Sequence, residues 1–383
     1  MKILITTDWF ATETNGVVTS VKNLAEELNK KGHDVRILTL SDSRYSHREG
    51  SVYYIRSIPL KVYPGVRMPL SYRHRLIKEL IEWKPDVIHS QCEFFSFQFA
   101  LYISKKTGAP LVHTYHTLYE QYVGYVMPSR RIGEKVVKTF SRRRLKKVQK
   151  VVAPTSKVED ALVGYGLRND ISVVPSGISL EQHQVRITHE ERQNKRHELG
   201  ISDDQLVLIN LGRLGNEKNL SELMEFFAKA QKNNKNLVFL IVGDGPAKEE
   251  LERQAKELGV ADKVIFTGMV KPTEVQMYYQ LGDVFVSAST SETQGLTYVE
   301  AAANGLPLLC RQDLCLKDVL AEGENGFDYT SEEEFMEKLD VLAEDENLRS
   351  EAGKKSEEIA ASFDKSAFGE AIEDVYLDVV NEK

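Results

Sequence analysis

Apolar and polar residues alternate along the chain in blocks that fit strands followed by helices. Residues 2–7 are apolar and of strand length. After a polar loop over 8–15, a helix is predicted from Gly16, because apolar residues recur at helical spacing at Val17, Val21, Leu24 and Leu28. The next apolar run, 35–40, is again of strand length. This order predicts a βαβ unit and therefore a parallel sheet covered by helices.

The same alternation continues through two halves of similar length. In the first half, further strands are predicted at 52–55, 87–89, 111–114, 151–153 and 171–174, with helices at 73–82, 97–107, 131–148 and 157–164. In the second half, strands are predicted at 206–211, 238–242, 264–266, 284–286 and 308–310, with helices at 219–232, 247–257, 273–280 and 296–304. From residue 331 onward the pattern is helical.

This pattern predicts an α/β fold of two doubly wound, Rossmann-like domains that face a cleft. The chain has 383 residues, more than one hydrophobic core usually serves. We place the boundary after Pro175-Ser176-Gly177 and take the polar stretch 179–197 as the connection. The expected parts are an N-terminal domain at 1–178, a C-terminal domain at 179–360 and a last helix at 361–383, expected to pack back on the N-terminal domain.

Composition excludes several classes of protein. Hydrophobic residues make up 42% and charged residues 28% of the chain, which argues against intrinsic disorder. No apolar run approaches the roughly 20 residues that a membrane-spanning helix needs. The three cysteines, Cys92, Cys310 and Cys315, lack the spacing of a metal site, and we expect them to be reduced in a cytoplasmic protein.

Positive charge is concentrated in one segment. Residues 128–150 contain ten Lys or Arg residues and one acid, a local charge of +9, whereas the whole chain carries −7 and the remainder therefore −16. A helix with a cationic stripe beside apolar residues suits an anionic membrane surface better than nucleic acid. The alternative is an ordinary solvated helix face. The candidate membrane-binding residues are Arg130, Arg131, Lys135, Lys138, Arg142, Arg143, Arg144, Lys146 and Lys147.

Glycines and charged residues gather where the strands of the second half end. The first strand is followed by Gly212-Arg213-Leu214 and Glu217-Lys218-Asn219, the second by Gly243-Asp244-Gly245-Pro246 and the third by Gly268-Met269-Val270. Each glycine turn alone is a weak signal. In an open α/β sheet, however, these positions converge beyond the carboxyl ends of the strands, where ligands bind. Their recurrence indicates a nucleotide site.

The fourth strand leads into a stretch with two carboxylates, Glu292 and Glu300. Between them Gln294-Gly295-Leu296 opens a helix, whose free N–H groups and partial positive charge suit a phosphate. The carboxylates lie roughly 10 Å apart in this interpretation. They could hold sugar hydroxyls on one side and a ribose on the other. Taken alone, the stretch could equally be a capped helix with two surface glutamates.

These motifs, with Glu292 and Glu300 as a Glu-x7-Glu pair, resemble glycosyltransferase family 4, whose members are retaining GT-B enzymes that use nucleotide sugars. The resemblance covers essentially the whole chain, including Asn15-Gly16 after the first strand, where this chain has a single glycine and many members have two. The segments 114–120 and 290–297 resemble the branch that glucosylates diacylglycerol.

The resemblance implies a role for each matching residue. Arg213 and Lys218 would neutralise the leaving diphosphate, with backbone N–H groups of Leu296 and Thr297. Glu292 would bind the transferred sugar, Glu300 the ribose and Val270 the base. The other implied donor-site residues are Gly16, Gly243, Gln294 and Gly295. His116 would sit beside the sugar near the acceptor, although a packed structural histidine is the default for a strand end.

The resemblance thus implies a UDP-sugar donor, a lipid acceptor and peripheral association with the inner face of a bacterial cell membrane. Because Arg213 and Lys218 supply two fixed cations, we expect no essential metal ion and no cofactor. A family member acting on a soluble or cell-wall polysaccharide acceptor is the alternative. From other classes, a nucleotide-sugar epimerase on the same fold and a non-catalytic nucleic-acid binder remain open, and the strand-end residues argue against the latter.

Overall fold

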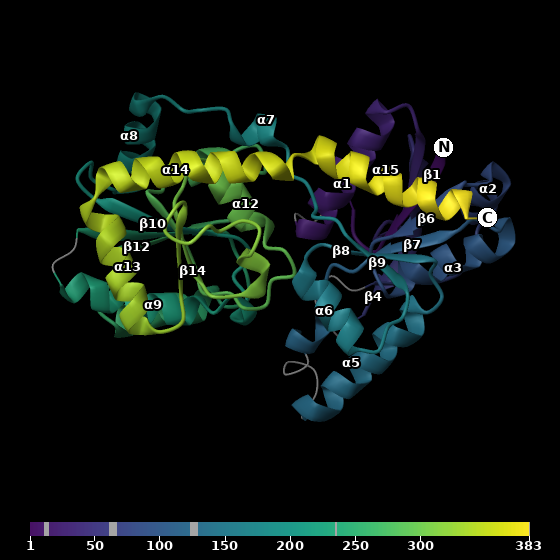
Figure 1. Cartoon of the computed structure of the whole chain (residues 1–383), viewed down its shortest axis with the longest axis horizontal. Coiled ribbons are helices and arrows are strands. Elements are labelled where there is room, and N and C mark those ends of the chain that lie inside the picture. The colour runs from purple at the N-terminus through teal and green to yellow at the C-terminus, as the bar shows by residue number, and fades with distance from the viewer. Residues whose placement is uncertain (11–14, 61–66, 123–128, 234–235, 383) are drawn as a thin grey trace. The chain divides into compact units, whose positions relative to one another are not determined.

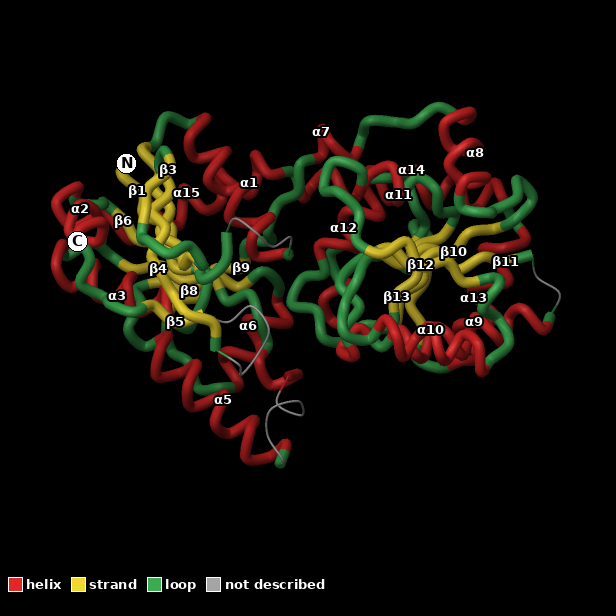
Figure 2. The backbone as a smooth tube through the Cα atoms, turned by 180° about the vertical axis from the view of Figure 1, so that it is seen from behind, coloured by secondary structure: helices red, strands yellow, loops and turns green. Residues whose placement is uncertain are grey.

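The computed structural model describes residues 1–10, 15–60, 67–122, 129–233 and 236–382, and the chain divides into two compact units. Unit 1 comprises Met1–Ile178 with Lys365–Lys383, and unit 2 comprises Ser179–Asp364. Each unit is a parallel-sheet α/β structure, with its strands enclosed by helices (Figure 2). The predicted α/β class of two Rossmann-like domains is confirmed. Residues 11–14 of the predicted first loop lie outside the described residues.

Unit 1 contains one sheet, with strand order β3-β4-β2-β1-β6-β7-β8-β9 and with β5 paired to β4. All pairs are parallel except those that β3 and β5 make with β4. The strands are β1 (Lys2–Thr7), β2 (Asp34–Ser41), β3 (His47–Glu49), β4 (Val52–Pro59), β5 (Arg67–Pro69), β6 (Val87–Ser90), β7 (Leu111–Thr114), β8 (Lys150–Ala153) and β9 (Asp170–Val173). The helices are α1 (Gly16–Lys30), α2 (Arg75–Trp83), α3 (Phe95–Thr107), α5 (Arg130–Leu145), α6 (Ser156–Gly164) and α15 (Lys365–Asn381), with a 3-10 turn η1 (Tyr119–Tyr122).

Strand β1 is buried on both faces because helices cover both sides of the sheet. Ile3 and Ile5 belong to the core that α1 and α15 cover, whereas Leu4 belongs to the core under α2 and α3. This division follows from the period-2 alternation of side chains along a strand. Strands buried on both faces are continuously apolar, which is why the sequence pattern located them well.

The last helix, α15, belongs to unit 1, where it runs along α1 (Figure 1). Lys365 Nζ donates to Glu26 Oε1 over 2.8 Å, and Tyr376 Oη lies 2.7 Å from Nδ1 of the buried His89. Gly369 allows close approach, since a Cβ there would come within 2.7 Å of Glu27 Cβ. The helix begins at Lys365 after a 3-10 turn, η4 (Ala361–Phe363).

Unit 2 contains one sheet of parallel strands in the order β12-β11-β10-β13-β14-β15. The strands are β10 (Leu206–Leu211), β11 (Leu237–Val242), β12 (Val264–Gly268), β13 (Val284–Ser287), β14 (Leu308–Arg311) and β15 (Gly326–Tyr329). The helices are α7 (Leu180–His183), α8 (His189–Glu198), α9 (Leu220–Lys232), α10 (Lys248–Glu257), α11 (Val275–Tyr279), α12 (Leu296–Ala303), α13 (Glu332–Glu344) and α14 (Glu346–Ala360), with 3-10 turns η2 (Asn216–Lys218) and η3 (Leu314–Leu316).

The sequence pattern missed several short elements. Strands β3, β5 and β15 were not predicted, and the stretch 179–197, expected to be a plain connection, contains α7 and most of α8. Helix α8 is polar almost throughout and is fixed by a capping box, in which Thr188 and Glu191 bond each other's backbone N–H. Arg192 and Arg196 also pair with Asp283, at 2.7 and 2.8 Å. Caps and ion pairs, rather than an apolar stripe, hold this helix.

In unit 2, backbone hydrogen bonds join the loops that follow β10, β11 and β12. Gly212 N donates to Val242 O, Leu214 N to Asp244 O, and Gly243 N to Gly268 O, at 2.9–3.0 Å. Gly243 has φ +134°, a conformation that essentially only glycine adopts. A Cβ at Gly243 would overlap the carbonyl oxygen of Gly212 and lie 3.0 Å from its carbonyl carbon. This glycine therefore serves loop-to-loop packing, not only approach of a ligand.

Replacing Gly243 with alanine is expected to lower the free energy of unfolding by at least about 3 kcal/mol, because strain and backbone overlap add. Gly259→Ala is the matched control: Gly259 also has positive φ (+74°), but nothing lies within 4 Å of its added Cβ. Gly259→Ala should lower the free energy of unfolding by only about 1 kcal/mol. Urea denaturation of the full chain, followed by circular dichroism, measures both, and equal losses would contradict the packing argument.

Candidate active site

The predicted cations of unit 2 lie on the loop after β10, and each meets a carboxylate. Lys218 ends the 3-10 turn η2, and its Nζ donates to Glu292 Oε1 at 2.5 Å. Arg213 Nη2 donates to Glu217 Oε1. The Lys218 and Glu292 side chains are 28% and 15% exposed, so this pair is partly shielded from water. The structure thus brings together Lys218 and Glu292, which are 74 residues apart in the sequence.

A row of hydroxyl groups connects the β10 loop with the loop that carries Glu292. Ser291 Oγ donates to the backbone oxygen of Glu217 at 3.1 Å, and it lies 3.2 Å from Ser289 Oγ. Tyr298 Oη in turn lies 3.0 Å from Ser287 Oγ at the end of β13. Because these serines are buried or nearly so, their hydrogen bonds fix the position of Glu292 relative to Lys218.

Helix α12 begins next to this loop. Gly295 precedes it in the left-handed region, φ +75°, and a Cβ there would lie 2.5 Å from the Tyr298 ring. Leu296 and Thr297 form the first turn, where backbone N–H groups have no carbonyl partner within the helix. A Cβ built on Gly212 would lie 3.9 Å from the Thr297 methyl group. The helix start therefore adjoins the β10 loop and can receive an anion beside its cations.

Glu300 lies one turn further along α12 and has its own partner. Tyr279 Oη, from α11, donates to Glu300 Oε2 at 2.9 Å. Burial raises the pKa of Glu300 to about 7, and the hydrogen bond from Tyr279 opposes that rise. Tyr279 had no sequence signal, because α11 is a short helix in which a tyrosine fits the core pattern equally well. Val270 follows β12, is partly exposed, and lies beyond the Gly243–Gly268 backbone bond.

Gln294, just before Gly295, is buried. The predicted residues Gly16 and His116 lie in unit 1. Gly16 opens α1 after Asn15, whose side chain accepts from Val18 N at 3.0 Å. His116 follows β7, and its Nε2 lies 2.7 Å from Gln91 Oε1, beyond β6. Burial lowers the pKa of His116 to about 3, and the nearby His113 acts in the same direction. The imidazole of His116 is therefore neutral at pH 7.

His113 has a different environment. Its Nε2 lies 3.2 Å from Glu93 Oε1, and Phe97 meets the ring edge to face at 5.4 Å. His113 and His116 thus have separate partners, Glu93 and Gln91. Among the described residues, no group of three or more His, Cys, Asp or Glu side chains is arranged to hold a metal ion.

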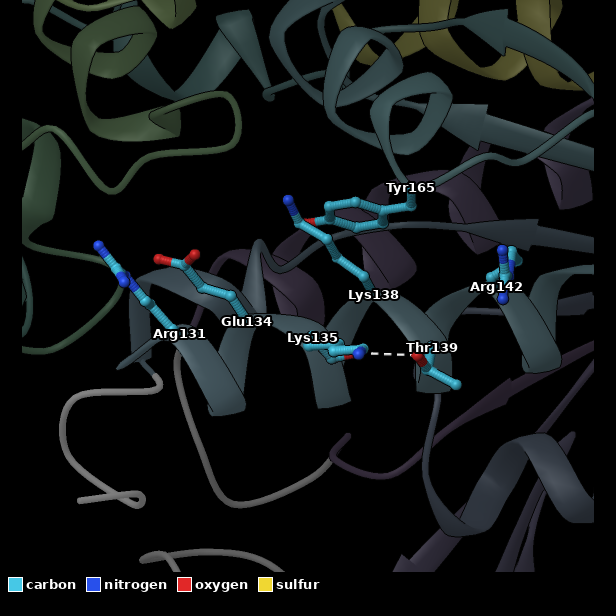
Figure 3. A pocket seen from close by; sticks show the side chains of 7 residues that line it. All are labelled: Arg131, Glu134, Lys135, Lys138, Thr139, Arg142 and Tyr165. Atoms are coloured by element: carbon cyan, nitrogen blue, oxygen red, sulfur yellow. Dashed lines mark hydrogen bonds between the residues drawn. The ribbon is translucent and has the colours of Figure 1, made fainter. Parts of the chain in front are cut away.

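Most of the basic segment forms α5, which ends at Leu145 and not at the predicted 148, so Lys146 and Lys147 follow the helix and Lys150 begins β8. Most of the cations in the segment are exposed. Arg131, Lys135, Lys138 and Arg142 line one side of a pocket of about 370 Å³ with Glu134, Thr139 and Tyr165 (Figure 3). Lys138 Nζ lies 5.8 Å from the centre of the Tyr165 ring. Arg144 differs from the other predicted cations, because its guanidinium stacks on Phe97 and Phe140, at 5.6 and 5.0 Å. These contacts with Phe97 and Phe140 explain the position of the Arg144 side chain without a role in membrane binding.

Helix α5 also exposes apolar side chains. Ile132 and Val136 are one turn apart, and they are 62% and 47% exposed. Exposed aliphatic residues flanked by cations are typical of helices that lie on a membrane surface. No helix within the described ranges is long and apolar enough to cross a membrane.

Comparison with known families matches each half of the chain. The model of Glycosyltransferase Family 4 matches residues 14–182, and that of Glycosyl transferases group 1 matches residues 191–359. The fold is also that of solved structures: the Anabaena protein Alr3699/HepE, crystallised with UDP and glucose, superposes with a TM-score of 0.79 at 16% identity, over 99% of this chain and 100% of that one. Sucrose-phosphate synthase from Thermosynechococcus elongatus gives 0.77 at 18% identity, over 100% of both chains.

Two similar relatives carry the same name. The alpha-monoglucosyldiacylglycerol synthase of Streptococcus pneumoniae (strain ATCC BAA-255 / R6) is 33% identical over 99% of this chain and 86% of its own length. That of Acholeplasma laidlawii is 32% identical over 100% of this chain and 98% of its own length. Similarity at this level along the whole length settles the family. The chain belongs to glycosyltransferase family 4, with the GT-B fold, and is a glycosyltransferase.

Proposed function

We propose that this enzyme transfers glucose from UDP-glucose, with retention of configuration, to a lipid such as 1,2-diacylglycerol at the cytoplasmic membrane surface. The observation that carries the proposal is the contact between Lys218 and Glu292, on a loop that also carries Arg213. It groups two cations and a carboxylate beyond the carboxyl ends of β10 and β13. The names of the two relatives support the acceptor and the sugar. The Anabaena protein solved with UDP-glucose supports the donor.

The chemistry of donor cleavage explains why the cations are needed. Breaking the bond between the anomeric carbon and the diphosphate develops negative charge on phosphate oxygens. Arg213, Lys218 and the first N–H groups of α12 are fixed before the substrate binds, so they stabilise that charge without reorganising. Two protein cations can supply what a metal ion supplies in other transferases, and we propose that this enzyme requires no metal ion or cofactor.

The carboxylates take separate parts of the donor. Glu292 is held by Lys218 and would accept hydrogen bonds from hydroxyls of the transferred glucose. Glu300 is held by Tyr279 and would bind the ribose, with Val270 near the base and Gly243, Gln294 and Gly295 shaping the backbone. In unit 1, Gly16 would approach the phosphates, and the neutral His116 would face the sugar on the acceptor side. A neutral imidazole can bond a hydroxyl without adding charge.

The surface of α5 supports a membrane-bound acceptor. Exposed cations on this helix can each contribute about 1 kcal/mol beside anionic lipid, and Ile132 and Val136 can enter the interface. The remainder of the chain is acidic, so attraction to anionic lipid would be local to this helix and would orient the enzyme. We propose that α5 docks on the inner face of the cell membrane.

Lys218→Ala and Glu292→Ala are each expected to lower turnover at least roughly a hundredfold, because each removes a fixed group beside the developing charge or the sugar. Transfer of labelled glucose from UDP-glucose to diacylglycerol in vesicles measures this. Lys195→Ala is the matched control, since Lys195 is also 28% exposed and ion-paired, to Glu198, but lies on α8, which precedes β10. If either Lys218→Ala or Glu292→Ala folds and keeps near-normal turnover, the residue replaced in that variant has no part in the proposed mechanism.

Replacing Lys135, Lys138 and Arg142 with Glu should weaken binding to anionic vesicles at least roughly a hundredfold, since three contributions of about 1 kcal/mol each are lost. Vesicle sedimentation measures it, with neutral vesicles in parallel. The control reverses three exposed lysines of unit 2, Lys232, Lys256 and Lys354, and so makes the same change in net charge.

Equal binding of the wild type to both kinds of vesicle, or equal loss in the two triple variants, would refute membrane docking by α5. A family member with a soluble or cell-wall polysaccharide acceptor would instead keep full activity without vesicles and tolerate the reversed charges. An epimerase would convert the nucleotide sugar with no acceptor present. A panel of nucleotide sugars, assayed with and without lipid, separates these outcomes.

A further inference from the structure

Glu217 is a buried carboxylate inside the proposed donor site. Its side chain is only 7% exposed, whereas that of Arg213, to which it is bonded, is 46% exposed. A carboxylate removed from water to this extent is costly unless a cation or several donors compensate it. The pair is therefore asymmetric: Glu217 lies inside the loop and Arg213 reaches outward from it.

The backbone on both sides of Glu217 is fixed. Lys218 N donates to Gly215 O at 3.0 Å and closes the 3-10 turn. Ser291 Oγ donates to the backbone oxygen of Glu217 at 3.1 Å and joins this turn to the loop that carries Glu292. Because these hydrogen bonds fix the backbone at Glu217, its carboxylate can hold another side chain in a defined position.

Gly215 leaves the space that the carboxylate occupies. A Cβ built on Gly215 would lie 2.6 Å from Glu217 Cδ and overlap both carboxylate oxygens. The backbone of Gly215, with φ −112° and ψ 154°, is ordinary extended geometry that any residue adopts. A Cβ at this position would therefore displace the carboxylate of Glu217 without straining the backbone.

Pairing with Glu217 leaves Arg213 able to bind a second anion. A guanidinium has five N–H donors in a planar fork, and the contact with Glu217 engages Nη2 alone. Without that contact, a long and half-exposed arginine would lose rotamer entropy on binding a phosphate. We infer that Glu217 is a positioning residue, which holds Arg213 where the donor diphosphate binds, and that Gly215 is the residue that makes room for it. This inference rests on the proposed role of Arg213.

The test is a mutant cycle read out by the affinity for UDP, measured by calorimetry, and by kcat for glucose transfer. Gly215→Ala keeps every charge and strains no backbone angle, so it should act only by displacing the carboxylate. We expect Arg213→Ala to weaken UDP binding about tenfold, and Gly215→Ala and Glu217→Ala each about three- to tenfold, with lower kcat. In the Arg213→Ala background neither substitution should weaken binding further, since coupled residues are not additive.

Two further variants separate positioning from a general effect on stability. Gly215→Ala combined with Glu217→Ala should match Glu217→Ala alone, because no carboxylate remains to be displaced. Gly164→Ala, at the end of α6 with nothing within 4 Å of the added Cβ, is the control and should leave affinity unchanged. Should Gly215→Ala not fold, Glu217→Ala in the two Arg213 backgrounds gives the same comparison.

The outcomes distinguish this inference from the proposed function. If Arg213→Ala weakens UDP binding while Gly215→Ala and Glu217→Ala stay within twofold of wild type, the positioning role is overturned and the proposed function stands. If Glu217→Ala weakens UDP binding in the Arg213→Ala background as much as it does in the wild type, the positioning role is also overturned. If Arg213→Ala binds UDP as the wild type does, the role of Arg213 in the proposed function fails, and the inference fails with it.

Discussion

Parallel strand pairing is the constraint on which unit 2 depends. When neighbouring strands all run in one direction, their carboxyl ends meet at a single edge, and the loops that leave them become neighbours although they are far apart in sequence. Here the loops after β10, β11 and β12 are joined by backbone hydrogen bonds, and the Ser291 hydroxyl joins the β13 loop to the β10 loop. Glu292 reaches Lys218 because of this arrangement.

At the carboxyl ends of these strands, the positive charges are paired with carboxylates before any substrate binds. Arg213 is paired with Glu217 of its own loop, and Lys218 with Glu292 of the loop after β13, so each cation is held by a carboxylate. On α12, the Glu300 carboxylate likewise has a fixed partner, since it accepts a hydrogen bond from Tyr279. Arg213 and Glu300 are thus each oriented by a neighbour, Glu217 or Tyr279, to which the sequence analysis assigned no role.

The sequence predicted the fold class and nearly every long element, because strands buried on both faces are apolar throughout and the helices between them keep a 3.6-residue period. Strand β1 was placed at its observed bounds for this reason. The pattern failed where other forces decide structure. Helix α8 is stabilised by its capping box and by Asp283, and β3, β5 and β15, with the sequences HRE, RMP and GFDY, have no continuous apolar run. The motifs suggested the residues that we propose to be catalytic. Their partners Glu217, Tyr279 and Gln91 were missed, because a side-chain hydrogen bond leaves no periodic signal in the sequence, whether the two residues are 4 positions apart, as for Glu217, or 21 and 25, as for Tyr279 and Gln91.

The return of α15 to unit 1 has a consequence for synthesis of the chain. Unit 2 is a continuous stretch of sequence, so all its residues have been synthesised before α15. Unit 1 by contrast is interrupted, and the face of its sheet that carries Ile3, Ile5 and Val112 lacks one covering helix until then. Domains usually fold from the N-terminus onward during translation. In this chain the first unit to begin folding is the last to be completed.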